Sequence, residues 1–379
     1  MDYMGARITA CCIEMKLYPS NAHIWVKCAG HSPLAARTPR IAPADDTARL
    51  EGILAHKVAD ARAKGEYLPT EGVTQEMLDG ANLWREVLDS WACVYATEVE
   101  YETIDWIGGD IPARTDAEGY NAETNTLHVG DYKFGHRWVD AFENWQLLIY
   151  AMAWLDRHNK EVHGKLDEMQ VVLHVVQPRA GGHRKWALSV SDLRVTYAKV
   201  IVAAAANART ANSSPNGLGL QLYTVGEHCY KCAGAINCPA LRNATTAALD
   251  FGGRAIELEL TPEQAAIELF LIDNAALHIK NRRDALEQLI EHSLGNGNAL
   301  PHWEMKRGRG SVKWINEAEV LALGELYGAD ISTVKLKTPK QCEKLLPAYI
   351  VESFTEQTQG ALKLSKKNAD DGNKLFTQE

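Results

Sequence analysis

The chain has 379 residues, of which 46% are hydrophobic and 23% charged, and its formal net charge is −9 at pH 7. This composition is typical of an ordinary soluble globular protein, and the length predicts two structural units. No apolar run of about 18 residues is present, and Met1–Ser20 lacks the basic and apolar segments of a secretory signal, so we expect a cytoplasmic protein without a membrane span. The acidic total does not exclude a nucleic-acid partner, because a partner meets the local field of a cleft.

Apolar periodicity predicts that helices and strands alternate along the first 250 residues, which is an α/β pattern. Helices are expected at 47–64, with Thr47 as a cap, and at about 74–91, 140–157 and 192–210. Strands are expected at about 94–104, 111–120 and 127–132. The nearly continuous apolar run at 171–177 is typical of a central strand that is buried on both faces.

The character of the chain changes near residue 250, after a loop at 212–219 and a cysteine-rich segment. A long amphipathic helix is expected at about 261–293, followed by a Gly/Asn loop and a basic, hairpin-like stretch. We expect 363–374 to be a frayed tail. We therefore predict a main domain that ends at about residue 250 and a mainly helical α+β accessory region at 251–379.

Asp131 and Lys133 form an Asp-Tyr-Lys motif at the end of a predicted strand, where residues i and i+2 point to the same side. Asp116 lies on the preceding predicted strand, and antiparallel pairing can bring its carboxylate beside Asp131. Together with the imidazole of His56 and the backbone carbonyl of Tyr132, these groups suit Mg²⁺ or Mn²⁺. Lys133 would orient an attacking water, and the metal would stabilise charge that develops on a phosphate. Taken singly, each residue has a structural interpretation, a solvated strand face or a structural histidine.

The order of the motifs resembles the PD-(D/E)XK nucleases of the RecB family. The resemblance covers about residues 25–240 and rests on Glu51-Gly52-x-x-x-His56, Asp116, Asp131-Tyr-Lys133 and Gln146-x-x-x-Tyr150. It implies a restriction-endonuclease-like core, which is a central mixed sheet flanked by helices. It also implies that the main domain is 15–250, since similar proteins start shortly before the position of Cys28, and that 1–14 is an N-terminal extension; a short disordered tail is the alternative. It also implies two metal-ligating acids, a metal-ligating histidine and a catalytic lysine, which would be Asp116, Asp131, His56 and Lys133.

Gln146 and Tyr150 are spaced i, i+4, which places them on one face of a predicted helix. In the resembling family this motif lies beside the active site and contacts DNA. The alternative is that both side chains are structural, since a tyrosine on such a face often simply packs.

Cys229-x-x-Cys232-x₅-Cys238-Pro239 brings three thiols close together in the sequence, which favours Zn²⁺ or an iron–sulfur cluster. Either centre needs a fourth ligand, for which the candidates are Cys28, Cys93, Cys342 and His228.

A subset of RecB-type nucleases, including AddB and the CRISPR-adaptation nucleases, carries a [4Fe–4S] cluster. One ligand precedes the catalytic histidine and three follow the Gln-x-x-x-Tyr helix. This resemblance implies an iron–sulfur clasp that consists of Cys28, Cys229, Cys232 and Cys238. The alternatives are zinc and ordinary free thiols. The cysteines outside this set are expected to be plain reduced thiols, and they include Cys11, Cys12, Cys93 and Cys342.

The most basic window of the chain contains Lys306, Arg307, Arg309 and Lys313 between Trp303 and Trp314. Basic groups interleaved with glycine and flanked by tryptophan suit a phosphate contact with base stacking alongside. This would make 251–379 a DNA-contacting region. A solvated hairpin is the alternative.

The layout as a whole also resembles uncharacterised bacteriophage proteins that have a RecB-like core. We therefore expect a Mg²⁺- or Mn²⁺-dependent deoxyribonuclease, an exonuclease that acts at DNA ends in phage or prophage recombination or DNA processing. Linear DNA, single- or double-stranded, is the expected partner, and a recombinase, a single-strand-binding protein or a second copy of the chain would be compatible. The alternatives are a catalytically silent DNA-binding or recombination-partner module and a zinc-ribbon interaction protein.

Overall fold

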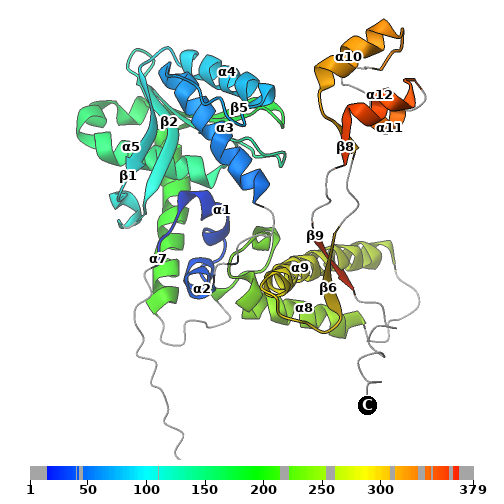
Figure 1. Cartoon of the computed structure of the whole chain (residues 1–379). Helices are drawn as coiled ribbons and strands as arrows, with labels where there is room; N and C mark the ends of the chain where they lie inside the picture. Colours follow the sequence, from blue (N-terminus) through cyan, green and yellow to red (C-terminus); the bar gives the residue numbers. More distant parts are fainter. Residues whose placement is uncertain are drawn as a thin grey trace, which may run out of the picture. The chain divides into compact units, whose positions relative to one another are not determined.

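Figure 1 shows the computed structural model of the chain. It describes residues 15–39, 41, 46–109, 111–213, 222–252, 261–307, 312–331, 338–342, 345–357 and 362–366. Two compact units are present, the first comprising Met1–Arg40 and Asp46–Leu286 and the second comprising Ile41–Asp45 and Glu287–Glu379. This division lies within a long helix, α9 (Pro262–Gly295), rather than near residue 250. The predicted extension at 1–14 lies outside the described residues.

The first unit contains a five-stranded mixed sheet with strands in sequence order. Its strands are β1 (Tyr95–Tyr101), β2 (Ala113–Asn121), β3 (Thr126–Tyr132), β4 (Gln170–Gln177) and β5 (Gly182–Ser189). All neighbouring pairs are antiparallel except β3 and β4, which are parallel. A parallel connection requires a crossover, and the chain makes it through α5 (Trp145–Val162). The expected central mixed sheet flanked by helices is thus present.

Helices cover both faces of this sheet (Figure 1). On one face, α3 (Thr47–Lys64) and α4 (Gln75–Asp89) bury Val58, Met77 and Trp84 against sheet residues such as Ala117 and Tyr132. We call this buried cluster the α3/α4 core. On the other face, the α5 core joins the apolar side of α5 to α1 (Ala22–Trp25), α7 (Lys199–Ser213) and the inward residues of β3 and β4.

Side-chain caps set the first residues of two of these helices. Thr74 accepts a hydrogen bond from the backbone N–H of Met77 and so begins α4. Asn144 accepts from the N–H groups of Gln146 and Leu147, so α5 begins at Trp145 and not at residue 140 as the periodicity predicts. The N-cap of α3 is Asp46, whereas the sequence predicts Thr47. The predicted Ala-rich helix is α6 (Val190–Asp192), a π-helical segment (Leu193–Ala198) and α7.

Shorter elements complete the first unit. They are a 3₁₀ turn (Pro19–Asn21), α2 (His31–Arg37), two further 3₁₀ turns (Glu227–Cys229 and Ala235–Asn237) and α8 (Pro239–Gly252). Two more 3₁₀ segments flank the sheet, at Asp105–Ile107 and His163–Glu168. In none of the described helices is the chain long and apolar enough to cross a membrane.

The second unit has its own small core around Val320, Ile331 and Ile350. Its helices are α10 (Glu317–Leu326), α11 (Pro339–Cys342) and α12 (Ala348–Ser353). Its strands are β6 (Trp303–Arg307), β7 (Val312–Trp314), β8 (Thr355–Gln357) and β9 (Leu362–Lys366).

Two predictions about this unit are wrong. The basic stretch is not a hairpin, because β6 pairs with β9 and β7 pairs with β8. The tail predicted at 363–374 is not frayed throughout, since 363–366 belong to β9 and pair with β6. Residues 367–374 lie outside the described part. In both cases the partner strand lies about 50 residues away, and local periodicity does not indicate it.

Candidate functional site

An open cleft with a volume of ≈ 1130 Å³ lies at one end of the sheet in the first unit. Residues from separate elements line it, among them His56 of α3, Glu98 of β1, Asp116 of β2 and Tyr150 of α5. Lys133 follows β3 directly and also lines the cleft. Antiparallel pairing of β1, β2 and β3 therefore brings Glu98, Asp116 and Lys133 to one place, and the crossover helix α5 adds Tyr150.

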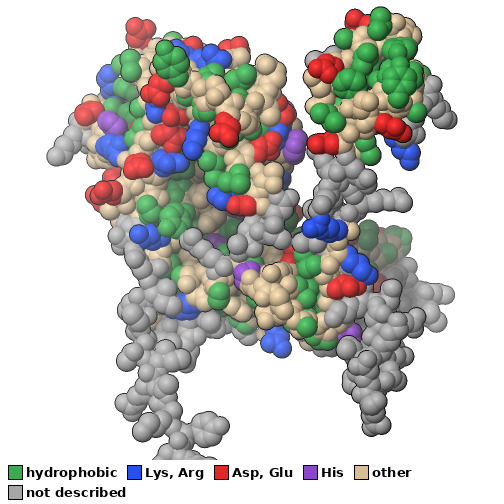
Figure 2. Space-filling view, in the orientation of Figure 1, with side chains coloured by type: hydrophobic (Ala, Val, Ile, Leu, Met, Phe, Trp, Pro, Cys, Tyr) green, Lys and Arg blue, Asp and Glu red, His purple; other side chains and the backbone are tan. Residues whose placement is uncertain are grey.

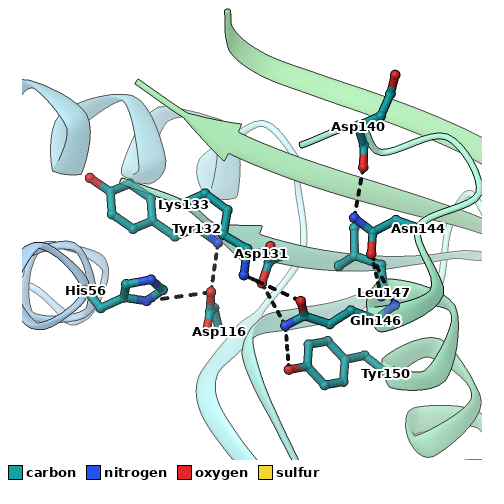
Figure 3. Close-up of polar contacts among 10 residues, drawn as sticks. All are labelled: His56, Asp116, Asp131, Tyr132, Lys133, Asp140, Asn144, Gln146, Leu147 and Tyr150. Atoms are coloured by element: carbon teal, nitrogen blue, oxygen red, sulfur yellow. Dashed lines mark hydrogen bonds and ion pairs between the residues drawn. The ribbon is translucent and has the colours of Figure 1, made fainter. Parts of the chain in front are cut away.

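Asp131 and Lys133 lie on the same side of β3, as the i, i+2 spacing predicts (Figure 3). The Lys133 Nζ donates to Asp131 Oδ1 over 2.8 Å, and the Gln146 Nε2 donates to the same oxygen over 3.1 Å. The Gln146 Nε2 also donates to the hydroxyl of Tyr150 over 2.8 Å, and Lys133 approaches Gln146 Oε1 at 3.5 Å. The two residues of the helical motif thus hold the carboxylate and the ammonium group in position.

Asp116 lies beside this network on β2. Its Oδ2 accepts the backbone N–H of Tyr132 over 2.8 Å and is 3.7 Å from Nδ1 of His56. The ring of Tyr132 points to the opposite face of the sheet from Asp131, into the α3/α4 core, where its centroid is 5.4 Å from that of His56. Tyr132 therefore connects Asp116 and His56, through its N–H and its ring.

Burial controls the protonation of this site. Desolvation, and then the neighbouring Asp131, raises the pKa of Asp116 to about 7. Desolvation also lowers the pKa of His56, which leaves the imidazole neutral and able to bind a metal. For Lys133, burial lowers the pKa, but Asp131 and Asp116 outweigh it and the net shift is upward. Lys133 is therefore a cation at neutral pH, suited to orienting a nucleophile and not to removing a proton.

The donor set fits a hard divalent cation. The side chain of Asp131 is 1% exposed, and its Oδ2 has no hydrogen-bond partner among the described residues. A buried carboxylate oxygen without a partner is costly, and a metal ion would remove this cost. His56 and Asp116 offer an imidazole nitrogen and a carboxylate oxygen of the kinds that bind Mg²⁺ or Mn²⁺, whereas Asp131 does not belong to the group of donor atoms within 4.8 Å of one another.

Glu98 belongs to this site although the sequence analysis did not find it. Within the described residues, one group of potential metal ligands has its atoms within 4.8 Å of one another, and it consists of His56, Glu98 and Asp116. In the sequence Glu98 is one acid of an alternating strand, where Glu98 and Glu100 suggest a solvated face. Its position depends on a left-handed backbone conformation at Glu98. Residue types alone do not predict that conformation.

A second pocket, of ≈ 10 Å³, contains the cysteines of the predicted clasp. Its lining includes Cys28, Cys229, Cys232 and Cys238 together with apolar residues such as Leu34. The Nδ1 of His31 lies 3.2 Å from the Sγ of Cys232. Cys93 and Cys342 are described and do not line this pocket. Cys11 and Cys12 are not among the described residues.

Four thiols around one pocket form a soft donor set. Burial raises the pKa of the Cys28 and Cys229 thiols and raises that of Cys232 to about 12, so without a metal these thiols are protonated. The pocket has room for about one water-sized group. Among the described residues, however, no three of these sulfur atoms lie within 4.8 Å of one another. Zinc–sulfur bonds are about 2.3 Å long, so a tetrahedral zinc ion would require the thiols to move closer together.

Charge around the cleft is mixed. Its lining includes the cations Arg49, Lys57, Lys64 and Arg114 and the acids Asp60, Glu98, Glu100 and Glu102. Figure 2 shows acidic and basic side chains interspersed on the visible face of the molecule. Any attraction for a polyanion would therefore be local, at Lys133 and at a bound cation, rather than a property of the whole rim.

The predicted basic window is only partly described. Arg307 is exposed at the end of β6, and Lys306 forms an ion pair with Glu304 over 2.7 Å. Lys313 lies in β7, and Arg309 is outside the described residues. The sequence count did not consider Glu304, which offsets part of the positive charge.

Comparison with known proteins identifies a family for this chain and several solved structures to which it is similar. The chain is similar to the structure named "Crystal structure of SSO0001", at 18% sequence identity and a TM-score of 0.30, over 60% of this chain and 87% of that one. The family described as "Protein of unknown function (DUF2800)" matches residues 122–371, which are 250 of the 379 residues and include Asp131, Lys133, Gln146, Tyr150 and three of the pocket cysteines. The chain therefore belongs to this family.

Proposed function

We propose that the protein is a metal-dependent deoxyribonuclease of the PD-(D/E)XK type, similar to RecB. One observation carries the proposal, the hydrogen-bonded network in the cleft that joins Asp131, Lys133, Gln146 and Tyr150 beside Asp116 and His56. These residues come from α3, β2, β3 and α5. A purely structural role for each residue would not explain why they meet at one place, or why a buried carboxylate oxygen of Asp131 has no hydrogen-bond partner among the described residues.

The side chains have distinct tasks in this proposal. A divalent cation, when bound, would supply charge that stabilises the phosphate in the transition state and would lower the pKa of a water. His56, Asp116 and Asp131 would hold that cation. Lys133 stays cationic and is fixed by Asp131, so it can orient a water or a phosphate oxygen.

Gln146 and Tyr150 support this arrangement as positioning residues. The amide of Gln146 already bonds Asp131 and Tyr150, and Tyr150 lines the cleft. A DNA strand in the cleft would therefore meet Tyr150, while Gln146 keeps the carboxylate and the lysine aligned. Exonuclease action at DNA ends, in a phage or prophage context, remains part of the proposal.

We propose further that Cys28, Cys229, Cys232 and Cys238 hold a [4Fe–4S] cluster that stabilises the fold. The spacing of the thiols in the sequence supports iron–sulfur, and so does their separation, because no three of the described cysteine sulfurs lie within 4.8 Å of one another. When bound, either centre would join two segments that lie about 200 residues apart (238 − 28 = 210).

Cleavage of end-labelled linear DNA beside a closed circle, with Mn²⁺ and with a chelator, tests the nuclease proposal. We expect loss of the linear label in Mn²⁺, and a rate lower by about 10²-fold or more in Asp131→Asn and Lys133→Ala. Asp89→Asn, an exposed carboxylate on α4, is the matched control and should cleave like the wild type. Wild-type rates in folded Asp131→Asn would sink the assignment. DNA binding without cleavage would instead favour a catalytically silent DNA-binding module.

A further inference from the structure

We propose that Glu98 is an additional side-chain ligand of the divalent cation, so that the cation binds between α3, β1 and β2. This inference rests on the metal site of the proposed function and adds a ligand that the family resemblance does not supply. The predicted ligand set contained acids from β2 and β3 only. Glu98 would add a carboxylate from β1.

The positions of the donor atoms support this role. His56, Glu98 and Asp116 each offer one ligand atom, and these atoms lie within 4.8 Å of one another. One imidazole nitrogen and two carboxylate oxygens form a donor set that Mn²⁺ accepts. All three residues line the open cleft, so a cation can reach them from solvent together with a substrate phosphate.

Glu98 reaches the cleft because the side chains of β1 change from one face of the sheet to the other along the strand. Tyr95 packs with the α3/α4 core, whereas Tyr101 belongs to the α5 core. Strict alternation would place both on the same side of the strand. Between them Glu98 has a φ of +53°, which is left-handed and unusual for a residue other than glycine in a strand.

The neighbouring strand changes face at the same level. In β2, Ala113 belongs to the α5 core and Ala117 to the α3/α4 core, although alternation would give them one face. The register pairs Thr97 with Ala117 and Val99 with Thr115, so Glu98 lies opposite Asp116. In both strands the side chains therefore change from one face of the sheet to the other at this pair. This change of face brings the carboxylates of Glu98 and Asp116 together beside His56.

The competing explanation is that Glu98 forms only a surface ion pair. Its Oε2 lies 2.8 Å from the Nε of Arg114, whose side chain is 62% exposed. Exposed ion pairs contribute little to stability, so this contact does not offset a strained backbone and two adjacent acids. Strain of this kind concentrates at binding and catalytic sites.

A second observation, on the neighbouring Asp131, also points to a ligand. Asp131 is buried, its Oδ2 has no hydrogen-bond partner among the described residues, and its charge acts directly on Asp116. Figure 3 shows the two carboxylates adjacent to each other. Asp131, Asp116 and Glu98 together bring more negative charge to one small region than Lys133 and Arg114 neutralise, which a divalent cation would correct.

Titration of the full-length protein with Mn²⁺ alone, followed by electron paramagnetic resonance or calorimetry, tests the proposal without relying on activity. We expect Glu98→Gln to weaken Mn²⁺ binding by about 10-fold or more. Two controls separate the explanations, Arg114→Gln, which breaks the ion pair, and Glu100→Gln, which removes the next acid on β1. Neither control should weaken binding.

Melting temperatures without metal guard against a folding defect. Glu98→Gly should melt no lower than the wild type, because glycine accepts a φ of +53° without strain, and it should also bind Mn²⁺ weakly. Wild-type affinity in Glu98→Gln, with lost affinity in Asp116→Asn, would overturn this inference and leave the proposed metal site intact. No Mn²⁺ binding by the wild type would overturn both.

Discussion

Asp116 lies in an environment that is unfavourable to its charged form when no ligand is bound. Its carboxylate is mostly buried, close to Asp131, and receives one backbone hydrogen bond from Tyr132. These surroundings raise its pKa to about 7, mainly through desolvation. A carboxylate whose charged form is destabilised by burial lowers the stability of the folded protein. Such groups are common in sites that bind a ligand.

Replacing Asp116 with asparagine should therefore stabilise the metal-free protein at high pH. Between pH 3.8 and about 7 the folded state holds a proton that the unfolded state has released, so the wild type loses stability as pH rises through this range. Each unit of pKa difference corresponds to about 1.4 kcal/mol. Thermal unfolding in metal-free buffer should show Asp116→Asn above the wild type at pH 8, with a smaller difference at pH 5.

The matched control for this measurement is Asp89→Asn, whose carboxylate is exposed on α4. It should follow the wild type at both pH values. A wild type as stable as Asp116→Asn at pH 8 would show that the buried carboxylate carries no such cost.

At the level of elements, the sequence predicts a residue well when its position depends on local periodicity. Asp131 and Lys133 share a side because strands alternate, and Gln146 and Tyr150 share a helix face because they are four residues apart. Glu98 could not be predicted, because its place depends on a change of face that one positive φ allows. The strand β5 was also missed, since its start, Gly182-His183-Arg184-Lys185, is polar and only pairing with β4 makes it a strand.

The short segments that carry the cysteines lead to a second stability prediction. Cys28 follows α1 and the other three thiols lie in the turns before α8, so a shared metal centre would hold these segments together. An iron–sulfur cluster would give the protein an absorbance near 400 nm. Cys28→Ser should lose this absorbance and should melt at a lower temperature than the wild type. Cys93→Ser, a matched control beside β1 in the same unit, should change neither.

Metal analysis of anaerobically purified protein separates the two centres. We expect iron and sulfide in the wild type and their loss in Cys28→Ser. About one zinc per chain with no iron would contradict the cluster and assign a zinc site to the same four thiols.

For the whole molecule, the question is whether the second unit contributes to DNA binding. Its most basic segment begins at the end of β6. There Arg307 is exposed, and Lys306 forms an ion pair with Glu304. An ion pair of this kind is weak enough for a phosphate to compete with it. The net charge of −9 means that such a segment would act locally, within about one Debye length of the DNA.

If these residues contact phosphates, Lys306→Ala/Arg307→Ala should weaken DNA binding for every sequence alike. The plot of log affinity against log salt should become shallower by roughly 0.7 to 0.9 per lost contact. Turnover at saturating DNA should change little, because the contacts contribute equally to substrate and transition state. Lys280→Ala, on α9, serves as a control. An unchanged slope in the double variant would mean that this segment does not touch DNA.

The cysteine pocket also sets an order of events during synthesis. Cys28 leaves the ribosome early, but the pocket cannot form until Cys238 has followed, 210 residues later (238 − 28). At about 5–20 residues per second this takes on the order of 10–40 s. By then β1–β5 have all been synthesised, since β5 ends at Ser189. Any metal delivered to the four thiols must therefore enter a chain whose sheet can already fold, and the cleft can take shape before the pocket is filled.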